Sequence, residues 1–303
     1  MKIGYPCINR ILGCKANSTF RLASYSEDRL LQTVEANLDC LERILHYNIR
    51  HGLLFFRITS DLVPFASHLV CNVDWRGAFA RRFAQIGALV QSHGLRISMH
   101  PDQFVLINAL DSRIVQSSVC ELEYHAQVLD ALGLDTTAKI QIHVGGVYGN
   151  KQASMQRFVS RFQDLDAAVR RRLVIENDDR SYTLRDCLQV HEATGIPVLF
   201  DSFHHEINHA GEGLAKALHA ARATWSAQDG LLMVDYSSQK AGARPGTHAS
   251  SLDKDHFAKF LGTASEGDFD LMLEIKDKER SALSAARLAS LDIRYHSVPA
   301  VGR

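Results

Sequence analysis

The sequence has 303 residues, of which 46% are hydrophobic and 22% are charged, so we expect a folded protein with a large buried core. Its 34 Lys and Arg residues balance its 34 Asp and Glu residues. This balance argues against a protein that coats nucleic acid through its net charge, although it allows a local basic patch. No stretch reaches the roughly 18 apolar residues of a membrane span, and the start, MKIGYPC, is more typical of a strand than of a secretory signal. We therefore expect a cytoplasmic protein that binds no membrane.

The six cysteines form no C-x-x-C pair, and some of them lie inside apolar runs. They stand at positions 7, 14, 40, 71, 120 and 187. Cysteines of this kind usually behave as small hydrophobic core residues. We therefore expect all six to be reduced, as in a cytoplasmic protein.

Apolar periodicity and turn signals divide the chain into alternating strands and helices. The expected elements, in chain order, are strand 3–8, helix 27–49, strand 53–58, helix 75–92, strand 95–99, helix 112–132, strand 138–144, helix 152–169, strand 172–176, helix 182–194, strand 197–201, helix 212–226, strand 230–236, helix 252–262, strand 269–275 and helix 277–290. Eight parallel strands with intervening helices are the number that closes a barrel. Since no Pro-, Gly- or Ser-rich linker divides the chain, the sequence predicts an α/β fold, with a single TIM (β/α)8 barrel as the catalytic domain over 1–290 and a C-terminal tail over 291–303.

The expected loops differ in length at the two ends of this barrel. Those that follow strands are long, at 59–74, 100–111, 201–211 and 236–251, whereas the turns that lead into strands are short. Barrel enzymes build their sites from the loops that follow the strands. The sequence therefore predicts an active site at the carboxyl rim of the strands.

Six of the expected strands end on, or next to, a side chain that can bind a metal ion. These runs are RISMH ending at His100, KIQIH at His143, LVIE at Glu176, PVLFD at Asp201, LLMVD at Asp235 and LMLEI around Glu274, and His204 and His248 follow in the loops. A single such residue is more often a hydrogen-bonded loop anchor, but parallel strands bring all their carboxyl ends to one rim. Mixed nitrogen and oxygen donors without thiolates suit Mn, Zn or Fe. Eight donors exceed the needs of one ion, so the sequence predicts a cluster of two or three.

Several motifs together resemble the UV damage endonuclease family (UvdE/UvsE), which is related to endonuclease IV among the xylose-isomerase-like barrels. They are FRITSDLVPFASH (56–68), MHPDQF (99–104), VIENDD (174–179), PVLFDSFHH (197–205), VDYSSQ (234–239) and GTH (246–248). The resemblance runs from about residue 1 to 275. It implies a TIM barrel, manganese ions, and cleavage of the DNA backbone immediately 5′ to a UV photoproduct, namely a cyclobutane pyrimidine dimer or a 6-4 photoproduct, with abasic sites as a further substrate.

The resemblance also implies the site residues. The metal ligands would be His68, His100, His143, Glu176, Asp201, His204, Asp235, His248 and Glu274, among which we expect Glu176, Asp201, Glu274 and His143 to carry the catalysis. Gln103 and Phe104 match the side chains that probe damaged duplex, and Phe104 stands where family members often have tyrosine. Tyr5 and Asn9 fall where the family contacts the lesion or the scissile region.

Two positions in the seventh strand depart from the family pattern. Met233 stands where some members have a lysine that takes part in the metal site, and Asp235 stands where a histidine can occur. Both departures put a third metal ion in doubt, while Mn²⁺ remains the expected ion and Zn²⁺ or Mg²⁺ the alternatives.

The expected mechanism is hydrolysis by an activated water, which leaves a 3′-hydroxyl and a 5′-phosphate and needs no organic cofactor. The loop YSSQKAGARPGTH (236–248) offers Lys240 and Arg244 for phosphate contacts, and Arg57 lies near it. Gln103 and Phe104 suit a wedge into weakened base stacking, although an exposed aromatic can also act as a lid over the barrel. We expect a monomer that acts on damaged double-stranded DNA.

Three other functions fit the same pattern. A metal-dependent sugar isomerase or epimerase needs fewer ligands and a closed pocket for a polyol. An apurinic-site endonuclease of the endonuclease IV type shares the cluster and differs only in the probing loop. A noncatalytic protein that binds metal or damaged DNA is disfavoured because binding alone needs no cluster of ions.

Overall fold

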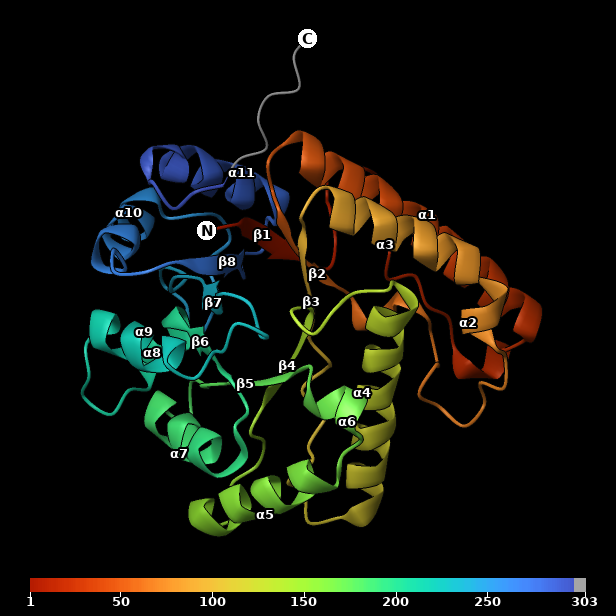
Figure 1. The fold of residues 1–303 in the computed structure, drawn as a ribbon, viewed down its shortest axis with the longest axis horizontal. Helices are drawn as coiled ribbons and strands as arrows, with labels where there is room; N and C mark the ends of the chain where they lie inside the picture. The colour runs from red at the N-terminus through yellow and green to blue at the C-terminus, as the bar shows by residue number, and fades with distance from the viewer. Residues whose placement is uncertain (297–303) are drawn as a thin grey trace.

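The structure, a computed structural model, describes residues 1–296. Eight parallel strands form a closed barrel in which each strand pairs with the next and β8 pairs with β1 (Figure 1). They are β1 Ile3–Pro6, β2 Phe55–Ile58, β3 Arg96–Met99, β4 Lys139–His143, β5 Leu173–Glu176, β6 Val198–Asp201, β7 Leu232–Tyr236 and β8 Phe269–Leu273. All eight strands predicted from the sequence are present, so the prediction of a TIM barrel is confirmed.

Helices surround the barrel (Figure 1). They are α1 Glu27–Arg50, α2 Trp75–Ala78, α3 Ala80–Ser92, α4 Ser112–Ala131, α5 Lys151–Asp164, α6 Ala167–Arg170, α7 Leu184–Thr194, α8 Ser202–Ile207, α9 Leu214–Arg222, α10 Lys254–Thr263 and α11 Glu279–Leu288, with short 3-10 turns η1 Leu22–Ser24, η2 Ser60–Leu62 and η3 Ala289–Leu291. Two predicted helices, 75–92 and 152–169, are each divided into two. Among residues 1–296, no helix has both the length and the apolar character to cross a membrane.

Local capping explains where several helices begin. Asp166 accepts a hydrogen bond from the amide of Ala168 and so starts α6 after the break in the predicted helix 152–169. Asp201 accepts from the amide of His204 and starts α8, a short helix where the sequence predicts a loop. A carboxylate at this position satisfies an amide that would otherwise lack a partner.

The barrel interior contains an apolar floor beneath the rim. Its members are Phe55, Val174, Leu199, Met233 and Met272, all fully buried, and they form a cluster separate from the main core. Successive strand residues point to opposite faces, so the residue two positions further along each strand also points inward. Those residues are Arg57, Glu176, Asp201, Asp235 and Glu274. The strand alternation thus places a charged layer directly above the apolar floor.

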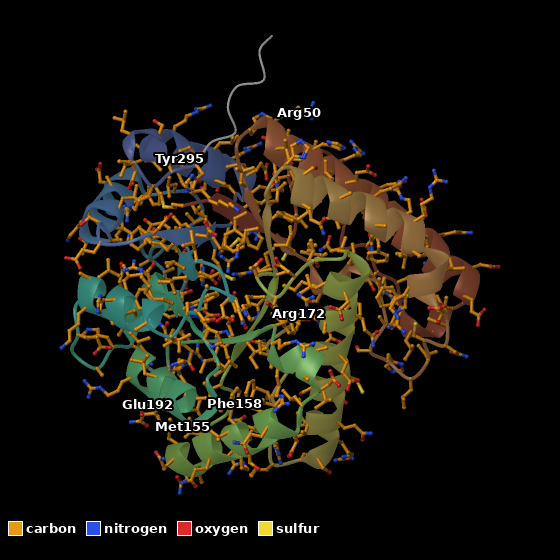
Figure 2. The ribbon with its side chains drawn as sticks, viewed as in Figure 1. Arg50, Met155, Phe158, Arg172, Glu192 and Tyr295 are labelled. Carbon is orange, nitrogen blue, oxygen red and sulfur yellow. A yellow bond between two sulfur atoms is a disulfide. The ribbon has the colours of Figure 1, made fainter. Side chains whose placement is uncertain are left out.

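The main core lies between the barrel and the surrounding helices. Figure 2 shows side chains that fill this space, including Met155 and Phe158 of α5, which are both buried. At the opposite end of the barrel, Arg172 is buried and donates to the Asp130 carboxylate and to backbone carbonyls of the turn that leads into β4. These contacts give the metal-binding end a rigid support.

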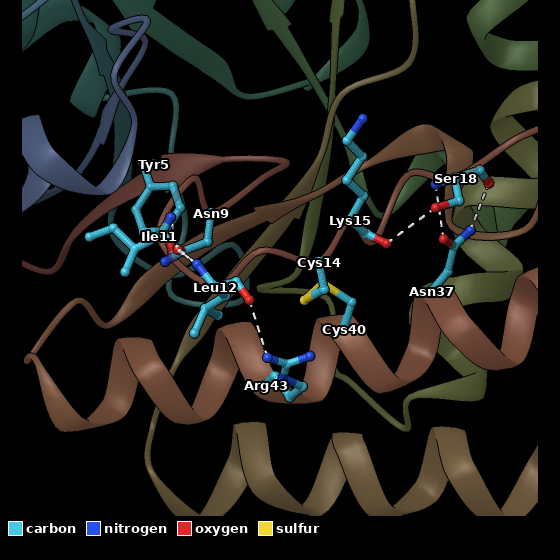
Figure 3. The surroundings of a disulfide bond; sticks show 10 residues. All are labelled: Tyr5, Asn9, Ile11, Leu12, Cys14, Lys15, Ser18, Asn37, Cys40 and Arg43. Atoms are coloured by element: carbon cyan, nitrogen blue, oxygen red, sulfur yellow. Dashed lines mark hydrogen bonds between the residues drawn. A yellow bond between two sulfur atoms is a disulfide. The ribbon is translucent and has the colours of Figure 1, made fainter.

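A disulfide joins Cys14, in the loop between β1 and α1, to Cys40 of α1 (Figure 3). The prediction that all six cysteines are reduced is therefore wrong for this pair, while Cys7, Cys71, Cys120 and Cys187 are free. The sequence offered no sign of the pairing because the two cysteines are 26 residues apart and meet only when the loop folds along the helix.

Hydrogen bonds hold the same loop on both sides of the disulfide. The Arg43 guanidinium donates to the carbonyl of Leu12 at 3.1 Å, and the Asn37 amide donates to the carbonyl of Ser18 at 3.0 Å (Figure 3). Asn37, Cys40 and Arg43, spaced three residues apart along α1, therefore all bind the loop that follows β1.

The expected tail 291–303 is only partly described. Arg294 pairs with the Asp292 carboxylate, and the amide of His296 donates to the carbonyl of Met1 at 3.0 Å. The tail thus packs at the amino-terminal end of the barrel up to residue 296. Residues 297–303 of this prediction lie outside the described part of the chain.

Candidate metal centre

Three overlapping groups of metal-binding side chains cross the mouth of the barrel. They are His100, His143 and Glu176, then Glu176, Asp201 and His204, and then Asp201, Asp235 and Glu274. Within each group, the donor atoms all lie within 4.8 Å of one another. Neighbouring groups share Glu176 or Asp201, so the donors form one continuous row, as the strand-end pattern predicts.

Glu176 connects the histidines of this row. Its Oε2 atom lies 3.8 Å from Nε2 of His100 and 3.9 Å from Nε2 of His143, and its Oε1 atom lies 3.0 Å from Nδ1 of His204. Burial alone would raise the pKa of Glu176, but the imidazoles of His143, His204 and His100 hold this pKa well below its usual range. Glu176 is therefore an ionised carboxylate that belongs to two of the groups that would hold metal ions.

Hydrogen bonds orient two further histidines toward the row. His204 Nδ1 faces the carbonyl of Asn177 at 3.0 Å, and His248 Nδ1 faces the carbonyl of Glu274 at 2.8 Å. A carbonyl can only accept, so Nδ1 of His248 carries the hydrogen and its Nε2 is left as a donor for a metal. In His204, Nδ1 also faces the carboxylates of Glu176 and Asp201, at 3.0 and 3.4 Å. His248 lies at the Glu274 end of the row, although it is outside the three tight groups.

Unsatisfied buried atoms test whether the residues fit metal ions. Nδ1 of His100, Nδ1 of His143 and Oδ2 of Asp201 are buried and have no hydrogen-bond partner among the described residues. Buried polar atoms are nearly always paired, so unpaired atoms within one cluster indicate a missing partner. The mixed nitrogen and oxygen donors suit Mn²⁺ or Zn²⁺. The residues present therefore fit a group of divalent ions.

Burial and neighbouring charges shift the pKa values of His100, Asp201 and His204. Burial lowers the pKa of His100 to about 4 and raises the pKa of Asp201 to about 7. Burial also opposes a charge on His204, but Asp201 and Glu176 outweigh it and raise the pKa of His204 to about 11. Without metal ions, His204 is thus the cation that compensates the neighbouring carboxylates.

Arg57 and Gln141 belong to the site but were not predicted as members. Arg57 is 2% exposed, and its Nη2 atom donates to both carboxylate oxygens of Asp235, each at 2.8 Å. Gln141 donates to Asp235 at 2.7 Å and also to Glu176. Arg57 lines the same cavity as Arg244 of the basic loop, but the alternation of β2 turns its side chain into the barrel, where it pairs with carboxylates. That alternation was the available signal.

Asn177 is a third residue that the sequence reading missed. Its side chain donates to the carbonyl of Asp201 at 2.9 Å and accepts from the amide of Asp201 at 3.0 Å. Its own carbonyl orients His204. Asn177 therefore holds Asp201 through its side-chain amide and His204 through its backbone carbonyl.

His68, which the family resemblance implied as a ligand, lies outside the row. Its ring is exposed, and Nδ1 accepts from the amide of Val70 at 3.0 Å. It lines a separate cavity of about 400 Å³, which also touches Asp102 and Phe104. The loop after β2 thus places His68 in a different cavity from the donor row, beside the loop after β3 that carries Gln103 and Phe104.

Tyr5 and Asn9 are internal supports, so the expectation that they contact the lesion is corrected. Tyr5 is fully buried and Asn9 is 3% exposed. The Tyr5 hydroxyl donates to Asn48 of α1, and Asn9 donates to Tyr5 while accepting from the amides of Ile11 and Leu12. Both residues shape the loop after β1 and do not face solvent.

An open cavity of about 740 Å³ lies above the donor row. Its lining includes His100, Gln103, Phe104, His143, Arg244, His248 and Glu274. Phe104 is 74% exposed at its edge, and Gln103 is also exposed. The loop after β7 carries Arg244 and the exposed Lys240, and a bridge between Gln239 and His248 holds its ends together. Exposed probing and basic side chains thus surround the metal-binding row.

The chain is similar to known proteins over nearly its whole length. The family described as UV-endonuclease UvdE matches residues 1–301. A UV DNA damage endonuclease of Bacillus thuringiensis subsp. konkukian (strain 97-27) is 38% identical, with 93% of this chain and 92% of that protein covered. A crystal structure of SacUVDE is 44% identical with a TM-score of 0.92, covering 96% of this chain and 98% of the other. Endonuclease IV from Thermus thermophilus, at 18% identity and a TM-score of 0.55 over 82% of this chain and 92% of the other, shares the fold. The chain belongs to the UV-endonuclease UvdE family, a family of DNA-repair endonucleases.

Proposed function

We propose that this protein cleaves the DNA backbone immediately 5′ to UV photoproducts and leaves a 3′-hydroxyl and a 5′-phosphate. Its substrates would be cyclobutane pyrimidine dimers and 6-4 photoproducts, with abasic sites as a further substrate. The observation that carries the proposal is the continuous row of donors beneath an open cavity whose edge bears the exposed Phe104. An open cavity suits a duplex, whereas a sugar isomerase needs a closed pocket.

The proposed cofactors are two or three Mn²⁺ ions, with Zn²⁺ or Mg²⁺ as alternatives. The residues that would hold them are His100, His143, Glu176, Asp201, His204, His248 and Glu274. Divalent ions in such a site lower the pKa of water and stabilise negative charge on phosphate oxygens. No organic cofactor is part of the proposal.

The protein's own side chains would position the DNA. Arg244 and Lys240 lie on the loop after β7, where they would bind phosphates on either side of the scissile bond. Glu176 and His143 would stand at the reacting phosphate, together with Asp201 and Glu274. Such phosphate contacts set the register of the duplex and carry no sequence preference, as expected for an enzyme whose lesions occur in many sequences.

Damage recognition would rely on Gln103 and Phe104. A photoproduct weakens base stacking, so the duplex kinks and opens at lower cost there than at undamaged steps. The exposed ring of Phe104 can stack on the opened bases, and Gln103 can hydrogen-bond to them. The Phe104 ring keeps the aromatic face that tyrosine supplies in relatives and lacks only the hydroxyl. The protein would act on this substrate as a monomer in the cytoplasm.

One cleavage assay tests the proposal. The protein and Mn²⁺ are incubated with end-labelled duplexes that carry a single cyclobutane dimer, a single abasic site or no lesion, and the ends of the products are mapped. We expect a cut immediately 5′ to the dimer and none in the undamaged duplex. Cleavage of the abasic duplex alone would identify an apurinic-site endonuclease, and epimerisation of a ketose without any cleavage would identify a sugar enzyme.

A further inference from the structure

Arg57 places a permanent positive charge inside the third donor group. This group consists of Asp201, Asp235 and Glu274, and its donor atoms lie within 4.8 Å of one another. Arg57 Nη2 lies 2.8 Å from both oxygens of Asp235, and Nη1 donates to Glu274. A guanidinium therefore already occupies both carboxylate oxygens of Asp235 and one oxygen of Glu274.

Gln141 completes the enclosure of Asp235. The Gln141 carbonyl oxygen accepts from Arg57 Nη2 at 2.6 Å, and its amide nitrogen donates to Asp235 at 2.7 Å. Asp235 is fully buried, and both of its oxygens have donors from the protein itself. In contrast, Oδ2 of Asp201 and Nδ1 of His100 have no such partner among the described residues. The unsatisfied atoms lie on His100 and His143 of the first group and on Asp201, which the second and third groups share, whereas Asp235 has none.

Displacement of Arg57 by an ion would be costly. The guanidinium is 2% exposed and lies above the apolar floor formed by Phe55, Met233 and their neighbours. A buried charge that loses its partners is strongly destabilising, because no water can replace them. An arginine side chain is always protonated in a protein, so Arg57 keeps its charge in this position.

The charge balance also favours two ions. Glu176, Asp201, Asp235 and Glu274 supply at most four negative charges. Two divalent ions with Arg57 supply five positive charges, which leaves one to balance a single phosphodiester. Three divalent ions with Arg57 would leave an excess of three in a buried site, which the low local dielectric penalises.

We infer that the Arg57 guanidinium takes the place of a third divalent ion, so that the protein binds two ions, one at His100, His143 and Glu176 and one at Glu176, Asp201 and His204. Arg57 is then a positioning residue that holds Asp235 and Glu274 against the second ion. The inference rests on the proposed function only in that the site binds divalent ions.

Metal stoichiometry tests this inference directly. The protein is stripped with chelator, saturated with Mn²⁺ and freed of excess ion, and bound manganese is measured by mass spectrometry beside a calorimetric titration. We expect two ions per chain in the wild type and two in Asp235→Asn, with affinity weakened by about 10- to 100-fold, the range of a group that orients ligands. Three ions in the wild type, with one lost in Asp235→Asn, would overturn the inference.

A substitution of Arg57 supplies a second readout. Arg57→Met removes the charge and keeps an unbranched side chain, so we expect the freed carboxylates to bind a third ion, whereas Arg57→Lys, which keeps the charge, should remain at two. A folded Arg57→Met variant that still binds two ions would contradict the exclusion by Arg57. If this variant does not fold, the wild type and Asp235→Asn still decide. Since the ions are counted without DNA, failure of the cleavage assay leaves this result intact.

Discussion

Glu176 is the residue on which the candidate site depends most. It is the one carboxylate shared by the first two donor groups, and three imidazoles lie within 4 Å of its oxygens. Its position follows from β5, which ends on Glu176 two residues after the floor residue Val174. Because Glu176 belongs to both groups, the loss of its negative charge would weaken the binding of an ion in either one.

We therefore predict that Glu176→Gln abolishes cleavage of dimer-containing DNA and removes at least one bound Mn²⁺. The amide has nearly the same shape as the carboxylate but cannot bridge two cations. Cleavage rate and bound manganese are measured on the same preparation, with circular dichroism to show that the fold persists. Glu192→Gln on α7 serves as the matched control and should change neither quantity. Near-normal turnover in Glu176→Gln would remove Glu176 from the mechanism.

His125 shows how a residue outside the site supports it. This histidine of α4 is fully buried, and the hydroxyl of Ser60 lies between its ring, at 3.1 Å, and the carbonyl of His100, at 2.9 Å. Burial lowers the pKa of His125 to about 4. The unfolded chain, with a histidine pKa of about 6.5, therefore binds the proton more readily between about pH 6.5 and 4.

Because the pKa of His125 is lower in the folded protein than in the unfolded chain, the free energy of unfolding falls as the pH falls. The stabilisation by neutral His125 is fully present above about pH 6.5 and is lost as the pH falls toward 4, by an amount on the order of 3 kcal/mol. In the metal-free protein, we predict that His125→Asn loses less stability than the wild type over this pH range. Urea unfolding at several pH values measures the difference. The exposed His219→Gln should retain the wild-type slope, and a parallel slope in His125→Asn would refute the role of His125.

At the scale of the element, the rim loops carry the features that distinguish this barrel. The loop after β3 places Phe104 at the edge of the large cavity, and the loop after β7 places Arg244 opposite donors of the row. A barrel separates such loops from its stable core, so they can vary without loss of the fold. The fold alone is shared with endonuclease IV, so the specificity must come from these loops.

We predict that Gln103→Ala combined with Phe104→Ala weakens binding to dimer-containing duplex by about 10-fold or more, as expected for the loss of one stacked base. Binding to undamaged duplex should change little, because phosphate contacts remain. Phe104→Tyr should retain binding, since the aromatic face is kept. Fluorescence anisotropy measures all three, with Leu291→Ala, a highly exposed position at the opposite end of the barrel, as the control. Unchanged affinity in the double variant would leave Phe104 as a lid.

The disulfide acts on the loop between β1 and α1. It closes a segment between cysteines 26 residues apart, which reduces the disorder of the unfolded chain. We predict that Cys14→Ser with Cys40→Ser lowers the free energy of unfolding by about 2–4 kcal/mol. Cys71→Ser, which removes a free thiol, should have a small effect. Thiol titration of the unfolded, unreduced wild type should find four thiols, the number of free cysteines, and six would show that the bond does not form.

At the scale of the whole molecule, the closed barrel brings charged side chains from successive strands together at one rim. Each inward strand residue of the floor is followed two positions later by a charged residue of the site. This relation explains why the strand-end side chains lie together in one row: the period of a strand and the common direction of parallel strands are local rules. Neither rule requires knowledge of which strands become neighbours.

The predicted site residues that lie outside the donor row depend on contacts between distant parts of the chain. Tyr5 lies in β1 and Asn9 follows it, yet both are buried: Tyr5 donates to Asn48 of α1, and Asn9 donates to Tyr5. His68 belongs to a family motif, but the path of its loop carries it into another cavity. Hydrogen bonds between distant residues decide both outcomes, and no local pattern contains them.

The sequence by itself determined the eight strands, the rim that bears the site and the identity of most donors, because hydrophobic periodicity and strand-end chemistry are properties of short segments. Only the tertiary structure decided that Arg57 pairs with Asp235, 178 positions away, and that Cys14 meets Cys40. The physical reason is that a closed barrel brings the interior residues of all its strands within contact distance, so the partner of a buried charge is set by closure and not by sequence neighbours.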